Sequence, residues 1–241
     1  MAKKIGKVKY LIIGNSAGGI GAVEAIRQVD KTGSVAIVSD EPYPVYSRPL
    51  ISPFLAKERP FENIVYRPAD FYEKNSIQTV LGVKVERLDL ARHAIELADK
   101  QKIEYEKLLL ATGGVPIFPE TEGSDLNGVF TFTTLDDAKA IDKFLGKPVR
   151  QAQGKPSAKK KVKAVVIGGG LIGVSVTEAL VKRGVAVTIV EMRDRVLNVV
   201  LDAAGSALAD EALKKVGVKI VPGHTVSKIN GAAGSVSGSV L

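Results

Sequence analysis

Cysteine is absent from all 241 residues of this sequence. Its absence excludes disulfides, thiolate metal ligands, cysteine-held iron–sulfur clusters and any redox-active cysteine in the chain. Only two histidines occur, His93 and His224, and they are too far apart for a paired metal site, so we expect no metal. No apolar run approaches the roughly 18 residues of a membrane span. Because residues 1–7 also lack the features of a signal peptide, we expect a cytoplasmic chain that does not contact a membrane.

The net charge of +8 is unevenly distributed. Residues 1–9 contain four lysines and no acid, and residues 147–163 contain seven basic residues and no acid. The remaining chain is slightly negative, so the basic charge belongs to a tail and a linker. This distribution does not indicate nucleic-acid binding. A solvated segment explains it, and an acidic docking partner is the alternative.

Two glycine-rich loops have the spacing of dinucleotide-binding fingerprints. Residues 14–19 (GNSAGG) follow the apolar run 8–13, and residues 168–173 (GGGLIG) follow the apolar run 162–167. In such a loop the first glycine permits a turn, the second lets the backbone approach a pyrophosphate, and the third allows close helix–strand packing. Two loops of this kind predict two nucleotides bound side by side, an arrangement typical of proteins that pass electrons between them.

The second loop matches this pattern more completely than the first. Gly168, Gly170 and Gly173 fill all three glycine places, whereas Ser16 takes the middle place between Gly14 and Gly19. Serine is small enough for close approach, so the first loop still predicts phosphate binding at a helix N-terminus.

An acidic residue follows each loop at about the spacing expected for a ribose ligand. Asp40 and Glu41 lie 21 and 22 residues beyond the first loop, and Glu191 lies 18 residues beyond the second. A carboxylate at Glu191 would repel a 2′-phosphate, which predicts NADH in preference to NADPH. The nearby Arg193 and Arg195 would soften that preference.

The order strand, glycine loop, helix, strand occurs twice and predicts an α/β fold with two Rossmann-like domains, parallel sheets and an inserted β-hairpin or meander. The strand from 107 onward is so apolar that we expect it to be buried on both faces. Strands are expected at 8–13, 35–38, 107–110, 162–167, 185–190 and 218–221, a hairpin at 83–97, the start of another at 231–240, and helices at 18–29, 69–75, 135–145, 171–183 and 203–216. We predict a first domain at 1–118, a connecting helix and Lys-rich linker at 119–160, and a second domain at 161–241.

The chain resembles the FAD-dependent pyridine nucleotide-disulfide oxidoreductases, most closely the NADH:rubredoxin reductases, ferredoxin reductases and NADH-oxidase-like proteins. The resemblance rests on both fingerprints, on their order, and on the motifs DEPY at 40–43, YSRP at 46–49 and YEKLLLATGG at 105–114. It implies FAD at the first loop and NAD(H) at the second. The implied FAD residues are Gly14, Ser16, Ala17, Gly18, Asp40, Glu41, Arg48, Val85, Ala111, Thr112 and Gly113. The implied NAD(H) residues are Gly168, Gly170, Leu171, Ile172, Gly173 and Glu191.

Four departures from the family pattern narrow this expectation. The missing cysteine excludes members that use a catalytic cysteine. The lysine that ferredoxin reductases carry after a Pro-Pro-Leu-Ser stretch is here Pro53, and its partner glutamate is Ser175. Family members continue past residue 241 with the returning half of the FAD domain and an interface domain. The resemblance therefore implies a chain truncated at its C-terminus, and a homodimer for the full-length form.

The resemblance implies a flavoprotein oxidoreductase that transfers a hydride from NADH to FAD and then electrons to an acceptor. The acceptor would be a small acidic redox protein such as rubredoxin or ferredoxin, or else oxygen or a quinone. The cofactors carry this chemistry, so we assign no catalytic side chain. The alternative is a non-catalytic nucleotide-binding or redox-sensing module that binds NADH but holds FAD weakly or not at all.

Overall fold

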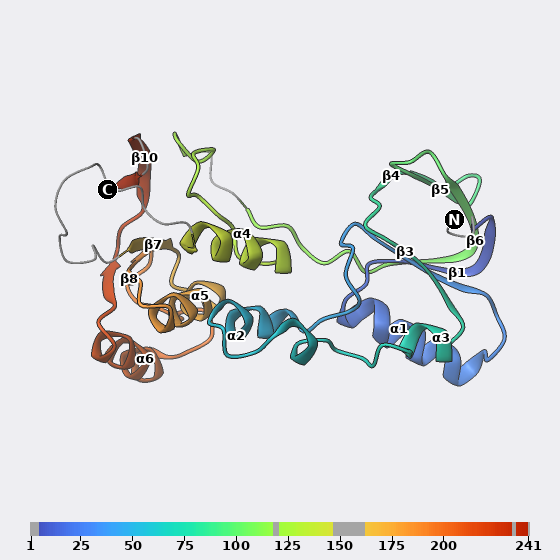
Figure 1. Ribbon diagram of the computed structural model, residues 1–241, viewed down its shortest axis with the longest axis horizontal. Helices are drawn as coiled ribbons and strands as arrows, with labels where there is room; N and C mark the ends of the chain where they lie inside the picture. Colours follow the sequence, from blue (N-terminus) through green and yellow to red (C-terminus); the bar gives the residue numbers. More distant parts are fainter. Residues whose placement is uncertain (1–4, 118–120, 147–161, 233–234, 241) are drawn as a thin grey trace. The chain divides into compact units, whose positions relative to one another are not determined.

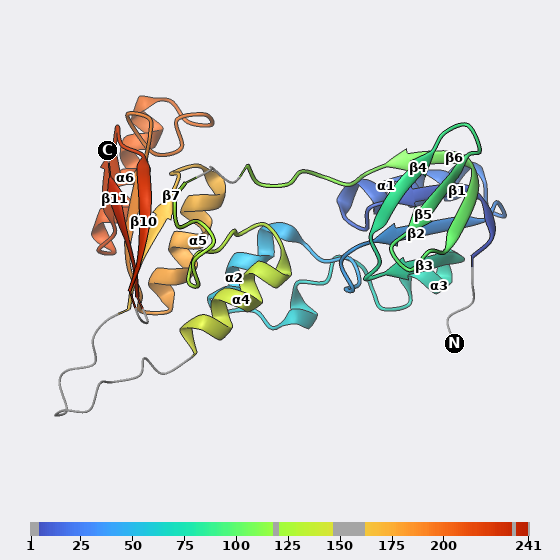
Figure 2. The ribbon, with the colours of Figure 1, turned by 90° about the horizontal axis from the view of Figure 1, so that it is seen from above.

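The computed structural model describes residues 5–117, 121–146, 162–232 and 235–240. Within it, residues 1–47 and 61–115 belong to one unit, and residues 48–60 and 116–241 belong to a second. Each unit is treated separately below (Figures 1 and 2). Of the predicted connecting helix and linker at 119–160, residues 119–120 and 147–160 lie outside the described residues.

The first unit is built on a six-stranded sheet with strand order β3-β2-β1-β6-β5-β4. Strands β3, β2, β1 and β6 are parallel, and β4, β5 and β6 form an antiparallel meander. Its strands are β1 (Lys7–Ile13), β2 (Val35–Ser39), β3 (Ile77–Leu81), β4 (Val85–Asp89), β5 (Ala94–Leu97) and β6 (Lys102–Leu110). Its helices are α1 (Ala17–Val29) and α3 (Phe71–Lys74), with a 3-10 turn, η2, at Phe61–Asn63.

Two apolar layers sandwich the parallel strands. On one side Ile12 and Ile37 pack with Ile20 and Val23 of α1. On the other side the parallel strands pack against the meander, which lies across them in Figure 1. All five residues of β2 are buried, as expected for a strand covered on both faces. The sequence therefore predicted the type and place of these elements correctly, and missed β3 and the first half of β6.

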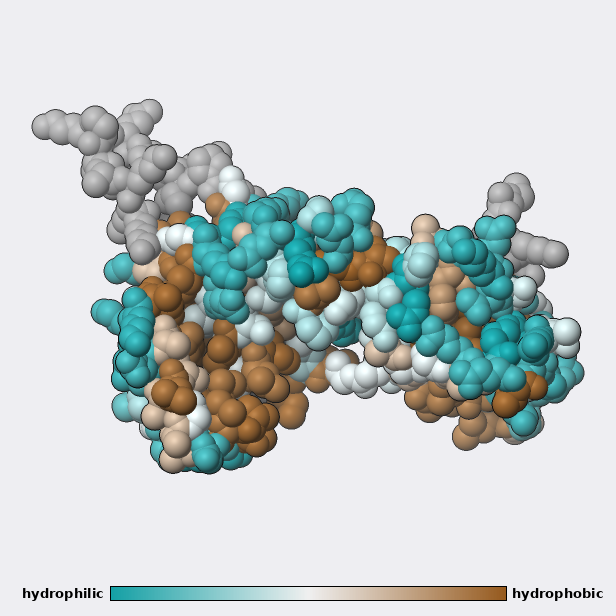
Figure 3. Space-filling view, turned by 90° about the horizontal axis from the view of Figure 1, so that it is seen from below, coloured by the Kyte–Doolittle hydropathy of each residue, from teal (hydrophilic) through white to brown (hydrophobic). Residues whose placement is uncertain are grey.

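One burial expectation was wrong. Leu109 and Leu110 at the end of β6 are 39% and 59% exposed, although we expected this strand to be buried on both faces. Within β6, only residues 102–104 pair with β5. Among the described residues, β1 is therefore the only strand that pairs with the far end of β6. Apolar side chains reach the surface in both units, where they appear brown in Figure 3.

The second unit contains a three-stranded parallel sheet of order β7-β8-β9 and the antiparallel hairpin β10–β11. Its strands are β7 (Lys163–Ile167), β8 (Ala186–Glu191), β9 (Lys219–Pro222), β10 (Val226–Ala232) and β11 (Ser235–Val240). Its helices are α2 (Ile51–Leu55), α4 (Leu135–Leu145), α5 (Leu171–Lys182) and α6 (Ala203–Lys215), with a 3-10 turn, η1, at Arg48–Leu50. Local signals explain two helix starts, because Thr134 and Asp137 form a capping box for α4 and Asp202 caps α6.

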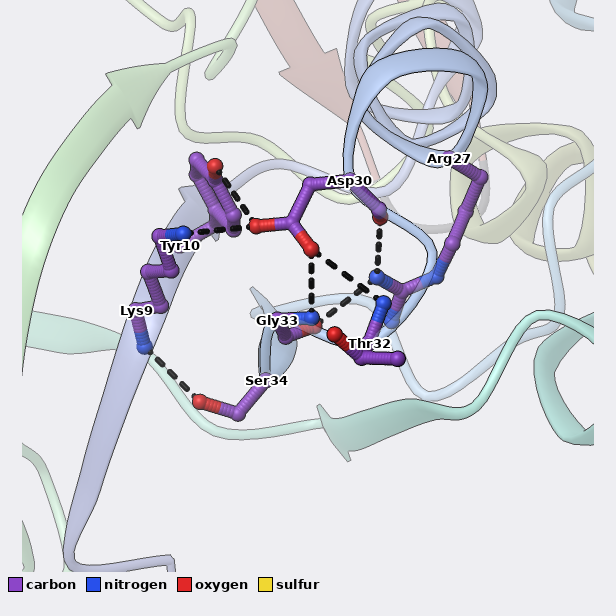
Figure 4. A network of polar contacts seen from close by, with 7 residues as sticks. All are labelled: Lys9, Tyr10, Arg27, Asp30, Thr32, Gly33 and Ser34. Carbon is purple, nitrogen blue, oxygen red and sulfur yellow. Dashed lines mark hydrogen bonds and ion pairs between the residues drawn. The ribbon is translucent and has the colours of Figure 1, made fainter.

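A polar network fixes the crossover between α1 and β2 in the first unit (Figure 4). The Asp30 carboxylate accepts hydrogen bonds from the Lys9 ammonium at 2.7 Å, the Tyr10 hydroxyl at 3.0 Å and the Gly33 N–H at 2.7 Å. Arg27 donates to the carbonyl oxygens of Asp30 and Gly33. The turn that returns the chain to the sheet is therefore held by one carboxylate and one guanidinium.

We expect Asp30→Asn to lower the melting temperature at neutral pH. Two hydrogen bonds, from the Lys9 ammonium and from the Gly33 N–H, hold the pKa of Asp30 well below its usual 3.8. A carboxyl whose pKa is lowered by folding contributes stability above its unfolded pKa, and that contribution is lost as the pH falls below about 4. The variant should therefore lose less stability than the parent between pH 5 and pH 3 in thermal unfolding followed by circular dichroism. Glu106→Gln, which alters an exposed carboxylate, is the control and should keep the parent's pH dependence.

Candidate functional site

The first glycine loop joins β1 to α1 through two close backbone contacts. Gly14 has φ of +119°, and a Cβ there would lie 2.0 Å from the Ala111 carbonyl oxygen. A Cβ on Gly19 would lie 2.0 Å from the carbonyl oxygen of Gly14. No other residue type fits these two positions without backbone movement. The contacts set the start of α1 directly beside the turn that follows β6.

The N-terminus of α1 is open to an anion. Ser16 is its N-cap residue, yet the serine side chain makes no capping bond, and the first turn contains no acid. Ala17 and Gly18 are exposed there. Because the first N–H groups of a helix have no intrahelical partner, this end can bind phosphate oxygens.

The other residues expected to bind FAD within the first unit border the same loop. Ala111 donates its N–H to Ile13 at 2.8 Å, and Thr112 and Gly113 follow it exposed. Asp40 is exposed at the end of β2, whereas the Glu41 carboxylate accepts a hydrogen bond from the Tyr46 hydroxyl.

Val85 begins β4, and the residues just before it are hydrogen-bonded to the segment that contains Asp40 and Glu41. The Gly82 N–H donates to the Glu41 carbonyl at 3.2 Å, and the Val83 N–H donates to the Ser39 carbonyl at 3.1 Å. The structure therefore brings the glycine loop, the acids, Val85 and residues 111–113 together. Arg48 belongs to the second unit, where its guanidinium donates to the Thr133 carbonyl at 2.7 Å.

Asn15 and Tyr72 support the first loop, and neither was predicted from the sequence. The Tyr72 hydroxyl donates to the Asn15 side-chain oxygen at 2.9 Å and accepts from the Val45 N–H at 2.9 Å. The Asn15 amide donates to the Tyr43 carbonyl. Burial raises the pKa of Tyr72, while its bonds to Val45 and Asn15 act in the opposite direction. A polar residue within a loop of small residues was the only available signal, since Tyr72 lies 57 residues away.

The second glycine loop repeats the geometry of the first. Gly168 has φ of +99° and donates its N–H to the Val190 carbonyl at 2.8 Å. A Cβ on Gly173 would lie 1.9 Å from the Gly168 carbonyl oxygen, whereas a Cβ on Gly170 would meet nothing within 4 Å. Gly170 is the N-cap of α5, with no side-chain cap and no acid in the first turn. Leu171 and Ile172 are 63% and 55% exposed at this end.

Glu191 at the end of β8 faces this loop. One oxygen of its carboxylate accepts from the Gly169 N–H at 2.6 Å, and the other accepts from the Arg193 N–H at 2.8 Å. The acid and the loop are thus held as one unit, and carboxylate oxygens retain lone pairs for a further donor. The Arg195 guanidinium instead donates to Asp194 at 2.8 Å and lines a hollow beside α6, whereas Arg193 is exposed.

Within the second unit, α2 is bonded to α5 next to the two positions that depart from the family pattern. The Ser52 hydroxyl donates to the Ser175 carbonyl at 2.6 Å, and Pro53 follows Ser52 in α2. Arg183 of α5 donates to the Leu55 carbonyl at 2.9 Å. The structure therefore brings together the elements that carry the two substituted positions, and the hydrogen bond beside those positions, from Ser52 to Ser175, is neutral.

Asp142 of α4 connects α2 and α5 electrostatically. It pairs with Lys57, just beyond α2, and with Arg183 of α5 at 2.8 Å. Burial raises the pKa of Asp142, but the hydrogen bonds from Lys57 and Arg183 outweigh burial, so its pKa is lower than usual. No local signal marked this connection, because its members are up to 126 residues apart in the sequence.

Comparison with known proteins identifies the family. The profile of the family described as pyridine nucleotide-disulphide oxidoreductase matches residues 8–241. The chain belongs to this family.

Its relatives include two proteins with oxidoreductase names. It is 34% identical to the NADH-dependent phenylglyoxylate dehydrogenase subunit epsilon of Aromatoleum evansii, over 97% of this chain and 52% of that protein. It is 32% identical to the rubredoxin-NAD(+) reductase of Pseudomonas putida, over 96% of this chain and 57% of that protein. It also resembles the solved covalent putidaredoxin reductase–putidaredoxin complex, with a TM-score of 0.81 and 26% identity over 97% of this chain and 56% of that one.

The chain thus spans about half the length of the curated relatives it matches. The family description names a pyridine nucleotide, and the first of these relatives is NADH-dependent by its name. In the described ranges, no helix is long and apolar enough to cross a membrane, and no group of three or more acidic or histidine side chains could hold a metal ion.

We expect Gly173→Ala to destabilise the second unit by at least about 2 kcal/mol, because the new methyl group would overlap a backbone oxygen that can move only with the loop. Gly170→Ala is the matched control. Its φ of −77° suits alanine and its Cβ position is open, so its free energy of unfolding should remain close to that of the parent. Urea unfolding of the three proteins measures the difference. Equal stabilities for the two variants would contradict the close approach described above.

Proposed function

We propose that this chain is the nucleotide-binding core of a flavoprotein oxidoreductase that transfers a hydride from NADH to FAD and then passes electrons to an acceptor. The observation that carries the proposal is the repeated loop geometry. Each of the two loops places an uncapped helix N-terminus, without acid in its first turn, at the end of a parallel strand. Family membership supports the assignment of the two loops to two different cofactors.

In this proposal the first unit supplies the first part of the FAD-binding domain. The loop Gly14, Ser16, Ala17 and Gly18 would bind the pyrophosphate. Asp40 and Glu41 would bind the adenosine ribose, the backbone at Val85 would meet the adenine, and Ala111, Thr112 and Gly113 would close over the cofactor. The uncapped N-terminus of α1 fits a pyrophosphate, since the first N–H groups of the helix have no intrahelical partner, and the tight turn at Gly14 places that end beside residues 111–113. Arg48 stays a candidate for the phosphates or the flavin side.

The second site would hold NADH. Gly168, Gly170 and Gly173 shape its loop, Leu171 and Ile172 present an apolar surface at the helix start, and Glu191 would accept hydrogen bonds from the ribose hydroxyls. Because Arg195 is bonded to Asp194 and directed toward α6, it does not offset the negative charge of Glu191. We therefore propose that the site prefers NADH to NADPH.

The bound cofactors would supply the hydride chemistry, and the protein would supply position and electrostatics. No side chain has to act as an acid or base in a hydride transfer. The chain contains no cysteine, so a thiol of this chain cannot relay electrons to the acceptor. The role of these residues is therefore to bind, orient and shield the two nucleotides.

For the acceptor, we propose a small acidic redox protein. The name of one relative is rubredoxin-NAD(+) reductase, and the similar solved structure is a complex between a reductase and putidaredoxin. Lysines between residues 147 and 163 would provide complementary charge. Oxygen and quinones are the competing acceptors in the assay.

The visible spectrum of the purified chain tests the proposal first. We expect a flavin band that bleaches when NADH is added without oxygen, and re-oxidises when a rubredoxin or ferredoxin is supplied. Gly170→Ala should keep the flavin band but lose bleaching by low NADH concentrations. A colourless protein that still binds NADH would contradict the proposal and indicate a nucleotide-binding module.

Coenzyme preference tests the role of Glu191. We expect Glu191→Gln to lower the ratio of NADH affinity to NADPH affinity at least about tenfold, or roughly 1.4 kcal/mol, because the variant loses a charged acceptor for the ribose and the repulsion of a 2′-phosphate. Fluorescence titration with each coenzyme measures the ratio. Glu211→Gln removes an exposed carboxylate of α6 that pairs with Lys215 and should leave the ratio unchanged. The same change in both variants would mean that only general electrostatics is involved.

A further inference from the structure

The two acids that follow β2 differ in how firmly the first unit holds them. Asp40 is exposed, and its side chain makes no hydrogen bond or ion pair within the part of the chain that the structure describes. Glu41 is partly buried and is held at three points. Its N–H donates to the Ser39 hydroxyl at 3.3 Å, its carbonyl accepts from the Gly82 N–H at 3.2 Å, and its carboxylate accepts from the Tyr46 hydroxyl.

Tyr46 is itself fixed before its hydroxyl reaches Glu41. The tyrosine is 7% exposed, and its ring meets the ring of Tyr43 edge-on with centroids 6.4 Å apart. The next residue, Ser47, donates its N–H to the Ile64 carbonyl at 2.8 Å. Because packing and backbone bonds already hold this ring, the hydroxyl can keep the Glu41 carboxylate in one place.

The segment that contains Glu41 lies at the first glycine loop. Strands β1 and β2 are parallel neighbours, so the loop and the acids follow them at the same edge of the sheet. Two bonds join the loop to the residues at and beyond the end of β2. The Gly14 N–H donates to the Val38 carbonyl at 2.8 Å, and the Asn15 amide donates to the Tyr43 carbonyl at 3.2 Å. A nucleotide whose pyrophosphate lies at this loop would therefore have the held carboxylate within its surroundings.

We infer that Tyr46 is a positioning residue, whose hydroxyl holds the Glu41 carboxylate so that Glu41, and not Asp40, binds the hydroxyls of the adenosine ribose. This inference rests on the proposed function and decides between the two acids that it names. An ionised carboxylate can accept more than one hydrogen bond, so the bond from Tyr46 leaves Glu41 able to bind a ribose. Asp40 would have to lose side-chain freedom on binding, whereas Glu41 has already lost it.

The test compares ADP with 2′,3′-dideoxy-ADP, which has the same phosphates and base but lacks both ribose hydroxyls. Each nucleotide is titrated into the ¹⁵N-labelled protein. The amide signals of residues 14–18 report on the first site, and those of residues 169–173 report on the second. In the parent, we expect the first site to bind ADP about tenfold more tightly than the dideoxy nucleotide, as suits hydrogen bonds to a charged acceptor.

Tyr46→Phe keeps the ring and removes the hydroxyl. We expect it to reduce this preference to about twofold at the first site, because the carboxylate is no longer preorganised, and to leave the second site unchanged. A purely structural role of the hydroxyl would weaken the binding of both nucleotides equally and leave their ratio as in the parent. Tyr66→Phe, which removes the hydroxyl of a tyrosine that is 42% exposed, is the matched control and should keep the parent's ratio.

Two further variants test whether Tyr46 acts through Glu41. Glu41→Ala should lower the ratio as far as Tyr46→Phe does, and adding Tyr46→Phe to Glu41→Ala should lower it no further. Asp40→Asn should keep the parent's ratio. The comparison of Glu41→Ala with Asp40→Asn tests the choice of acid without any change at the buried tyrosine.

The outcomes separate this inference from the proposed function. ADP binding at residues 14–18 with an unchanged ratio in Tyr46→Phe, or with equal losses of preference in Asp40→Asn and Glu41→Ala, would overturn the inference and leave the proposed function standing. An absence of ADP-induced shifts at residues 14–18 in the parent would refute the proposed first site and the inference with it.

Discussion

The close packing of a helix N-terminus on the strand before it is the constraint on which both candidate sites depend. In each loop, the last glycine lies against the carbonyl oxygen of the first, with room for a hydrogen atom and for no carbon. This contact fixes the direction of α1 and α5 relative to β1 and β7. Because neither helix start carries a side-chain cap, the first N–H groups of each helix also have no side-chain partner there.

The two loops share this backbone geometry and differ in what supports them. Side chains that are distant in sequence, Asn15 and Tyr72, connect the first loop to the segment after β2. The second loop is supported by its own acid, because Glu191 bonds directly to Gly169. Loss of Tyr72 would therefore remove a support of the first loop and no proposed ligand. Loss of the Glu191 carboxylate would remove both the support of the second loop and its proposed ribose ligand.

The segment 48–60 shows how far local patterns extend. The motifs at 40–43 and 46–49 supported the family resemblance, and nothing in the following residues predicted α2 or its partners. In the structure this segment is bonded to α5 through Ser52 and Arg183, and pairs with α4 through Lys57. A five-residue helix has too few turns to show a clear apolar period, so its packing could not be predicted from its own sequence.

The sequence by itself determined the fold class, the places of the two glycine loops, the acids after them and most element types, because these depend on residues that are close together in the chain. Tertiary structure decided what each side chain contacts. It exposed the end of β6, bonded Glu191 to Gly169, directed Arg195 toward α6 and placed Tyr72 under the first loop. Such contacts join residues from different elements, and local propensity contains no information about which elements will meet.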